Sequence, residues 1–269
     1  CAPSSRRTTR PASGTPARSL AAVSRLAVLV GTRKGLFILK SGRARRVWTM
    51  AGSHFLGQIV NHAVLDPRDG RTILAAVRAG HLGPTVFRST DLGRRWQEAK
   101  QPPAFANTAA ALPGRSVDHV FWLTPGHAGE RDTWYAGTSP QGLFRSEDGG
   151  VGWTPLPAVN DDAQFREWMG TVQDGTPDGP KLHSIIVDPR DPEHLLFAMS
   201  GGGVHESVDG GRSFKPLVKG MEVVGGFDPV RREWVSHARA DSRRSVGLPP
   251  LDGELVFDSP ALTEASHDF

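Results

Sequence analysis

Polar side chains recur at one position in three otherwise apolar segments of this sequence. The position lies five residues before a turn residue (Asp66, Thr124 or Asp188), and it is occupied by Asn61, His119 and His183. His62 and Asp118 stand directly beside two of these residues. Imidazoles that converge could bind a divalent metal ion, transfer protons, or hold an anionic or sugar ligand. We therefore interpret Asn61, His62, His119 and His183 as a candidate ligand site, with His119 and His183 as candidate metal ligands.

A simpler interpretation is that these side chains line a polar channel and contact trapped water. His54, in a short loop that precedes the first of the three segments, is a further candidate member of the group. The residue types alone leave the two interpretations open.

Acidic and aromatic residues also gather in a long connection at residues 154–181. Asp161, Asp162, Glu167 and Trp168 lie within it. Sugar sites use such a combination, because an indole stacks on the apolar face of a sugar and two carboxylates flank the scissile bond. Trp168 is thus a candidate ligand-binding residue, and Asp118 with Glu167 is a candidate catalytic pair. Alternatively, the aromatic residues only attach the connection to the body of the protein.

These candidates must be positioned by a repeated element, whose sequence signature is Ser-x-Asp-x-Gly-x-x-Trp/Phe. The copies begin at Ser89, Ser146 and Ser207, at a period of about 60 residues, which is typical of repeated supersecondary units. In such a turn the Asp accepts backbone N–H groups, the Gly supplies a positive φ, and the aromatic ring packs between strands of its own blade. The motif therefore has a structural role. The residues that we expect to perform it are Asp91, Trp96, Asp148, Trp153, Asp209 and Phe214.

Apolar runs and turn residues around each copy predict four antiparallel strands per unit, which is the blade of a β-propeller. The runs at 26–32, 35–40 and 46–50 resemble strands two to four of another blade whose innermost strand is missing. We expect an all-β propeller of about three and a half blades, and hence an incomplete one. It should span residues 25–227, between a disordered basic leader at 1–24 and a non-repeat tail at 228–269, disordered or frame-shifted, in which no strand is expected.

Composition narrows the class of protein further. The 269 residues carry a formal net charge of +4 and a pI near 9.6, but much of the positive excess lies near the two ends, so we do not expect nucleic-acid binding. No apolar run approaches the ~20 residues of a membrane span. The single Cys, Cys1, excludes a disulfide framework and a cysteine metal site. We expect a cytoplasmic protein without an organic cofactor; secretion or a lipid anchor on Cys1 are alternatives.

The three Asp boxes, together with the segments 30–37 (VGTRKGLF) and 200–204 (SGGGV), resemble those of the bacterial BNR/Asp-box repeat proteins. Members of that family are described as sialidase-like or glycosyl-hydrolase-like propellers. The resemblance covers about residues 25–227. It implies a protein that binds a glycan or similar polar ligand at the channel mouth. If the protein is catalytic, it hydrolyses that ligand. One alternative is a non-catalytic scaffold for protein partners, and a third is a metal-dependent hydrolase using the His cluster.

True sialidase machinery is not found in the sequence. Such enzymes, as the resemblance implies, use a Tyr nucleophile and three Arg residues around the substrate carboxylate. The only Tyr, Tyr135, aligns with the second-strand residues Ala75 and Phe197 and should therefore belong to the core. None of the aligned inner-strand positions is Arg, so the sialidase label is not supported.

Overall fold

The computed structural model describes residues 26–80, 83–105, 116–163, 165, 181–200, 203–217, 225–228 and 233–236. Within these ranges nearly all regular structure is β, and the helix α1 (Pro157–Asn160) is a single turn. No helix in these ranges has the length and apolar character needed to cross a membrane.

The strands form successive antiparallel sheets that we call the first to fourth blades. The first blade contains β1 (Leu26–Thr32), β2 (Gly35–Ser41) and β3 (Trp48–His54). The second blade contains β4 (Ile59–Leu65), β5 (Ile73–Arg78), β6 (Pro84–Ser89) and β7 (Gln97–Glu98). The third blade contains β8 (His119–Pro125), β9 (Trp134–Ser139), β10 (Leu143–Ser146) and β11 (Thr154–Pro155). The fourth blade contains β12 (Leu182–Val187), β13 (Leu195–Met199), β14 (Gly203–Ser207) and β15 (Lys215–Pro216).

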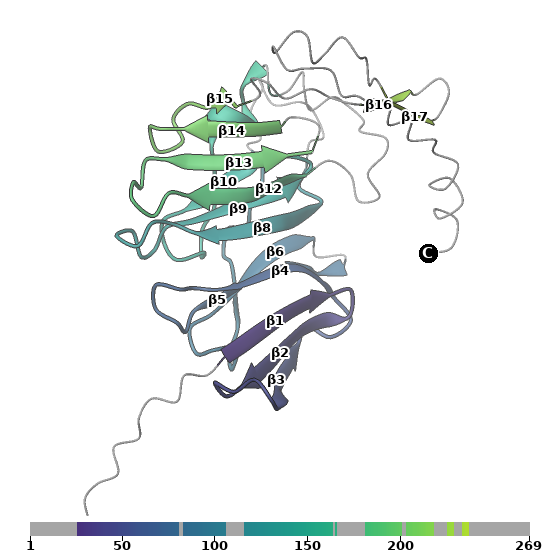
Figure 1. The fold of residues 1–269 in the computed structure, drawn as a ribbon, viewed down its shortest axis with the longest axis vertical. Coiled ribbons are helices and arrows are strands. Elements are labelled where there is room, and N and C mark those ends of the chain that lie inside the picture. The colour runs from purple at the N-terminus through teal and green to yellow at the C-terminus, as the bar shows by residue number, and fades with distance from the viewer. Residues whose placement is uncertain are drawn as a thin grey trace, which may run out of the picture.

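The blades follow one another in chain order, from β1–β3 at one end of the long axis to β12–β15 at the other (Figure 1). The first strands β4, β8 and β12 contact one another in that order and are therefore the inner strands. Three apolar clusters fill the spaces between successive blades, and each draws its residues from two neighbouring sheets. This arrangement confirms the predicted all-β propeller of four-stranded blades.

The first blade lacks an inner strand in the described part of the chain, as its sequence predicted. Gly31 in β1 lies against the carbonyl of Val60 in β4, just as Gly137 in β9 lies against the carbonyl of Leu182 in β12. A Cβ on either glycine would collide with that carbonyl oxygen. Because β9 is the second strand of its blade, β1 also occupies a second-strand position.

The three Asp-box turns have nearly identical hydrogen bonds, as the Asp and Gly spacing predicted. In each turn the Asp Oδ1 accepts the N–H of the residue four positions on, at 2.8–2.9 Å. The preceding Ser Oγ accepts the N–H of the Gly four residues on at 2.9 Å in all three copies. Those glycines, Gly93, Gly150 and Gly211, have φ values of 86°, 91° and 89°. None of the three Asp side chains is directed to a shared site.

The aromatic residue of the box packs as expected in one copy and differently in the other two. It was predicted to lie between strands of its own blade, and Phe214 does contact Phe197 of its own blade, at a ring-centroid distance of 4.9 Å. Trp96 instead contacts His54 and Phe55, at ring-centroid distances of 5.5 and 5.0 Å, next to the first blade. Trp153 belongs to the cluster between the second and third blades and is 2% exposed. The box therefore joins neighbouring blades as well as closing a hairpin.

The tail also differs from the prediction. A short hairpin pairs β16 (Gly225–Asp228) with β17 (Glu233–Ser236), although no strand was expected after residue 227. The other tail residues, and those of the N-terminal leader, lie outside the described ranges, so their expected disorder stays a prediction.

Candidate functional site

Three of the predicted polar residues, Asp118, His119 and His183, lie at the edge where the inner strands β8 and β12 begin. Asp118 immediately precedes β8, and its backbone N–H binds the carbonyl of Ser139 at the end of β9. Arg78, the last residue of β5, donates from Nη2 to Asp118 Oδ1 at 2.6 Å. Asp118 Oδ2 lies 2.7 Å from Nδ1 of His119. One carboxylate thus joins a guanidinium from the second blade to an imidazole of the third.

The solvent exposure of the side chain differs among the three hydrogen-bonded residues Arg78, Asp118 and His119. The Arg78 and Asp118 side chains are 44% and 46% exposed, whereas that of His119 is only 7% exposed. The carboxylate can therefore contact a ligand from solvent while it fixes the orientation of a buried imidazole. A carboxylate held by a guanidinium and an imidazole is suited to accept hydrogen bonds from sugar hydroxyls.

The ring of Phe121 connects His119 with His183. Its centroid lies 6.1 Å from that of His119 and 6.3 Å from that of His183, with both pairs nearly edge-on. Lys181 Nζ lies 5.5 Å from the centre of the same ring. Burial, followed by the charge of Lys181, lowers the pKa of His183. A half-buried aromatic ring is thus surrounded by polar and basic groups.

His119 does not hold the position that sequence alignment gave it. The backbone N–H of Gly126 binds Thr133 O in the way that Asp66 binds Thr72 and Asp188 binds His194, so Gly126 is the turn residue of the third blade. Counting back five residues from Gly126 reaches Phe121 instead of His119. The equivalent residues are Asn61, Phe121 and His183, and the longer turn of the third blade misled the alignment.

The inner strands share a β-bulge close to these equivalent residues. The pairing register shifts between Val60 and His62 in β4 and between Val120 and Trp122 in β8. In β12 it shifts between His183 and Ile186, and Ser184 has a φ of 56°. A bulge redirects a side chain out of the regular alternation, which explains how a polar residue can occur within an apolar strand. Asn61 is such a polar residue, and its buried Nδ2 has no hydrogen-bond partner among the described residues.

His62 has a structural position apart from this group. Its ring stacks on Trp122 at 4.5 Å and 16°, and its Nδ1 accepts the backbone N–H of Leu123 at 3.1 Å. Burial lowers its pKa to about 4. This imidazole is therefore neutral near pH 7 and links the second blade to the third. His54 likewise lies elsewhere, beside Trp96.

The two remaining candidates, Glu167 and Trp168, lie outside the described residues, so the carboxylate pair Asp118 and Glu167 stays a prediction. Within the described residues no group of three or more His, Cys, Asp and Glu side chains could hold a metal ion. His119 and His183, the predicted metal ligands, each pack against Phe121, as described above.

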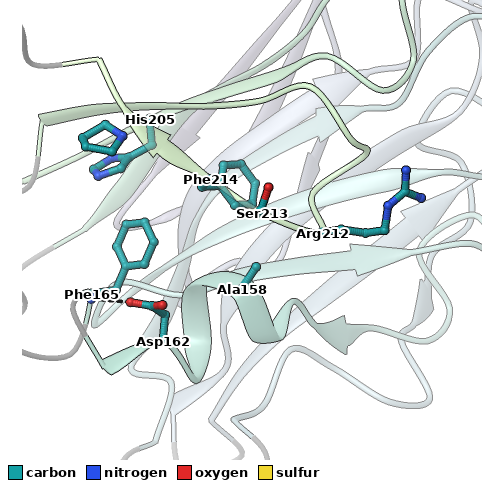
Figure 2. Close-up of a pocket in the computed structure, with 8 residues that line it drawn as sticks. Ala158, Asp162, Phe165, His205, Arg212, Ser213 and Phe214 are labelled. Carbon is teal, nitrogen blue, oxygen red and sulfur yellow. Dashed lines mark hydrogen bonds between the residues drawn. The ribbon is translucent and has the colours of Figure 1, made fainter.

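A separate cavity of about 190 Å³ lies between the start of the 154–181 connection and the fourth blade. Its lining includes Asp162, Phe165, His205 and Phe214, with Arg212 at its side (Figure 2). His205 is fully buried, and its ring stacks on Phe197 at 5.1 Å. The polar groups here serve the fold: Ser213 binds Asp209, Arg212 binds Glu193, and Asp162 accepts the N–H of Phe165. Sequence reasoning did not find this cavity, because β14 is distant in the chain from the connection.

The fold of this chain is a β-propeller whose blades carry the Asp-box turns that its motifs predicted. No protein-family model matches the chain. It is similar to a xyloglucanase of a Paenibacillus species, with 30% identity over 157 residues. This match covers 55% of the chain but only 13% of the relative's length.

Solved structures are also similar to this chain over only part of their length. A GH74 enzyme of Niastella koreensis is 16% identical, with a TM-score of 0.47, over 71% of this chain and 28% of that one. A GH74 xyloglucanase of Xanthomonas campestris is 23% identical, with a TM-score of 0.39, over 76% of this chain and 37% of that one. The chain therefore spans a minor part of each of these larger proteins.

Proposed function

We propose that this chain binds a glycan, or a ligand equally rich in hydroxyl groups, at the edge where its inner strands begin. The observation that supports the proposal best is the Arg78–Asp118–His119 chain beside the ring of Phe121. A carboxylate with fixed orientation accepts hydroxyl hydrogen bonds, and an aromatic ring covers the apolar face of a sugar. The similarity to a xyloglucanase favours xyloglucan as the first ligand to test.

Hydrolysis would require a second carboxylate on the other side of the bound glycan. Glycosidases place two carboxyl groups on either side of the scissile bond. Asp118 is the first candidate, because it is half exposed and already oriented. Glu167, in the connection at 154–181, remains the candidate for the second.

Binding can be tested by titrating the protein with xyloglucan oligosaccharides in a calorimeter. We expect Asp118→Asn and Phe121→Ala each to weaken binding at least about tenfold, the loss of one good polar or stacking contact. Glu193→Gln is the matched control, since Glu193 is a half-exposed carboxylate paired with Arg212 in the fourth blade. Unchanged affinity in Asp118→Asn, or equal losses in the control, would contradict the proposed site.

Catalysis is tested separately by the release of reducing ends from the same oligosaccharides. Glu167→Gln should abolish this release while leaving binding nearly intact, because a catalytic carboxylate contributes mainly to the transition state. Binding without release in the unsubstituted protein would remove the hydrolytic version and leave the binding function.

A further inference from the structure

Two apolar sheet faces are exposed at opposite ends of the row of blades, and each matches one half of an interface that is buried elsewhere in the same chain. We propose that the outer face of the first blade, here the start face, binds the outer face of the fourth blade, here the end face, of a second copy. This interaction surface is independent of the proposed ligand site.

The start face consists of residues from all three strands of the first blade. Val28 pairs with Leu39 and Leu39 with Met50, so the three side chains form one row across the sheet. Val28 is 41% exposed and Met50 is 63% exposed. Val30 and Trp48, on the same face, are also exposed. An apolar patch of this kind on one side of a sheet is typical of an interaction surface.

Equivalent residues of the other blades show what such a face normally contacts. Because Gly31 corresponds to Gly137, Val28 corresponds to Trp134 and Val30 corresponds to Ala136. Trp134 and Ala136 are 1% and 0% exposed and pack against the second blade. The start face is therefore the side of a blade that normally receives the preceding blade.

The end face corresponds to the side of the second blade that packs on the third. Leu74, Ala76 and Val86 are fully buried at that junction. Register makes Leu196, Ala198 and Val204 their equivalents in the fourth blade, and all three are only partly buried. Ile186, the equivalent of Val64, is 55% exposed. The end face thus offers the same apolar row without a blade to cover it.

These equivalences favour contact between the two different faces. Within the chain every junction joins the end side of one blade to the start side of the next, and two start sides never meet in the described blades. A second copy that presents its start face to an exposed end face repeats this geometry. Such a contact is heterologous, so it leaves one start face and one end face available for further copies.

The test uses sedimentation velocity on the full chain over a wide range of concentration. We expect the unsubstituted protein to form dimers and larger species as concentration rises. Val30→Asp blocks the start face and Ile186→Asp blocks the end face, so each variant alone should be monomeric. An equimolar mixture should recover a dimer and nothing larger, because one unblocked face of each kind remains. Val208→Asp is the matched control: Val208 is 66% exposed, in an Asp-box turn outside both faces, and its variant should associate like the unsubstituted protein.

Several outcomes would overturn the proposal. A monomer at every concentration would show that the faces are covered by the chain itself or do not associate. Monomers in the mixture of the two variants would exclude the head-to-tail contact. Equal loss of association in Val208→Asp would indicate non-specific aggregation. Circular dichroism melting of each variant confirms that the fold is retained, which is expected because all three positions are exposed.

Discussion

The sequence Asp-Pro-Arg-Asp occurs twice, and its two copies lie in contrasting surroundings. Asp66 and Arg68 form a two-pronged ion pair at the junction of the second and third blades, and Asp188 and Arg190 form the same pair in the fourth blade. The Arg68 side chain is 6% exposed, whereas that of Arg190 is 85% exposed. The aspartate is buried in both copies, but the arginine is buried in one region and solvated in the other.

The difference comes from what lies beyond each arginine. Arg68 also donates from Nη1 to the carbonyls of Glu130 and Thr133, at 2.8 and 3.0 Å, and its guanidinium lies 5.0 Å from the ring centre of Trp134. The turn of the next blade is thus held by the arginine of the preceding one. A repeat motif can consequently build its own turn everywhere, yet contribute to stability mainly where another blade follows.

The largest effect that separates the two regions should come from the aromatic residue of the Asp box. Trp153→Ala at the buried junction should lower the free energy of unfolding by about 3–5 kcal/mol, since it leaves a large cavity between two blades. Phe214→Ala, in the fourth blade where the ring is only partly buried, should cost clearly less. Urea unfolding followed by tryptophan fluorescence and circular dichroism measures both, and equal losses would contradict the comparison.

Removing the arginine of each pair should give the next largest difference. Arg68→Ala removes the guanidinium that pairs with the 4%-exposed Asp66 and one of the donors to each of two turn carbonyls, and should cost about 4 kcal/mol. Arg190→Ala removes a solvated guanidinium, while the buried Asp188 keeps the backbone N–H of residue 190 and His194 as partners, so the unfolding midpoint should change little. If Arg190→Ala were as destabilising as Arg68→Ala in the same urea titration, burial would not be the cause of the difference.

Two histidines should give the two regions opposite dependences on pH. Burial lowers the pKa of His62 to about 4, so its contribution is complete above the unfolded value of 6.5 and decreases as the pH falls from 6.5 toward 4. The decrease should be on the order of 3 kcal/mol, from 2.5 pKa units at ~1.4 kcal/mol each. His62→Gln, which cannot titrate, should flatten the unfolding free energy across this window.

His194 should act in the other direction and more weakly. Its hydrogen bonds to Glu206 and Asp188 raise its pKa, so its contribution is complete below pH 6.5 and decreases as the pH rises through the raised value. His194→Gln should remove a small loss of stability on the alkaline side of 6.5. A variant that instead changes the acid side would contradict the assigned interaction. Thermal melts at a series of pH values test both histidines together.

Prediction from the sequence succeeded where local chemistry determines the structure. The Asp-box turns could be predicted because Ser146, Asp148 and Gly150 satisfy one another within a few residues. The position of β1 as a second strand could be predicted because the runs at 26–32, 35–40 and 46–50 resemble strands two to four of the other blades. Such features depend little on distant parts of the chain.

Prediction failed where spacing varies or contacts are distant in the chain. The third blade has Gly126 in place of the Asp-Pro-Arg turn, and the misalignment moved His119 into a position that belongs to Phe121. The Arg78–Asp118 ion pair joins residues from two blades, so no local pattern indicates it. The cavity at His205 and the strand β17 were missed because neither follows the repeat.

The bulges of the inner strands have a consequence for how this scaffold can diversify. Asn61, Phe121 and His183 have unrelated chemistry at one equivalent position, while Val60, Val120 and Leu182 before them are all buried and apolar. Asn61 and Phe121 are the extra residues of their bulges, and His183 directly precedes the bulge of β12, so these positions are less bound by the regular alternation of the strand. If the proposed ligand site is correct, substitutions at these three positions alter ligand preference with little cost to the core, which makes them suitable sites for a combinatorial library of new binding specificities.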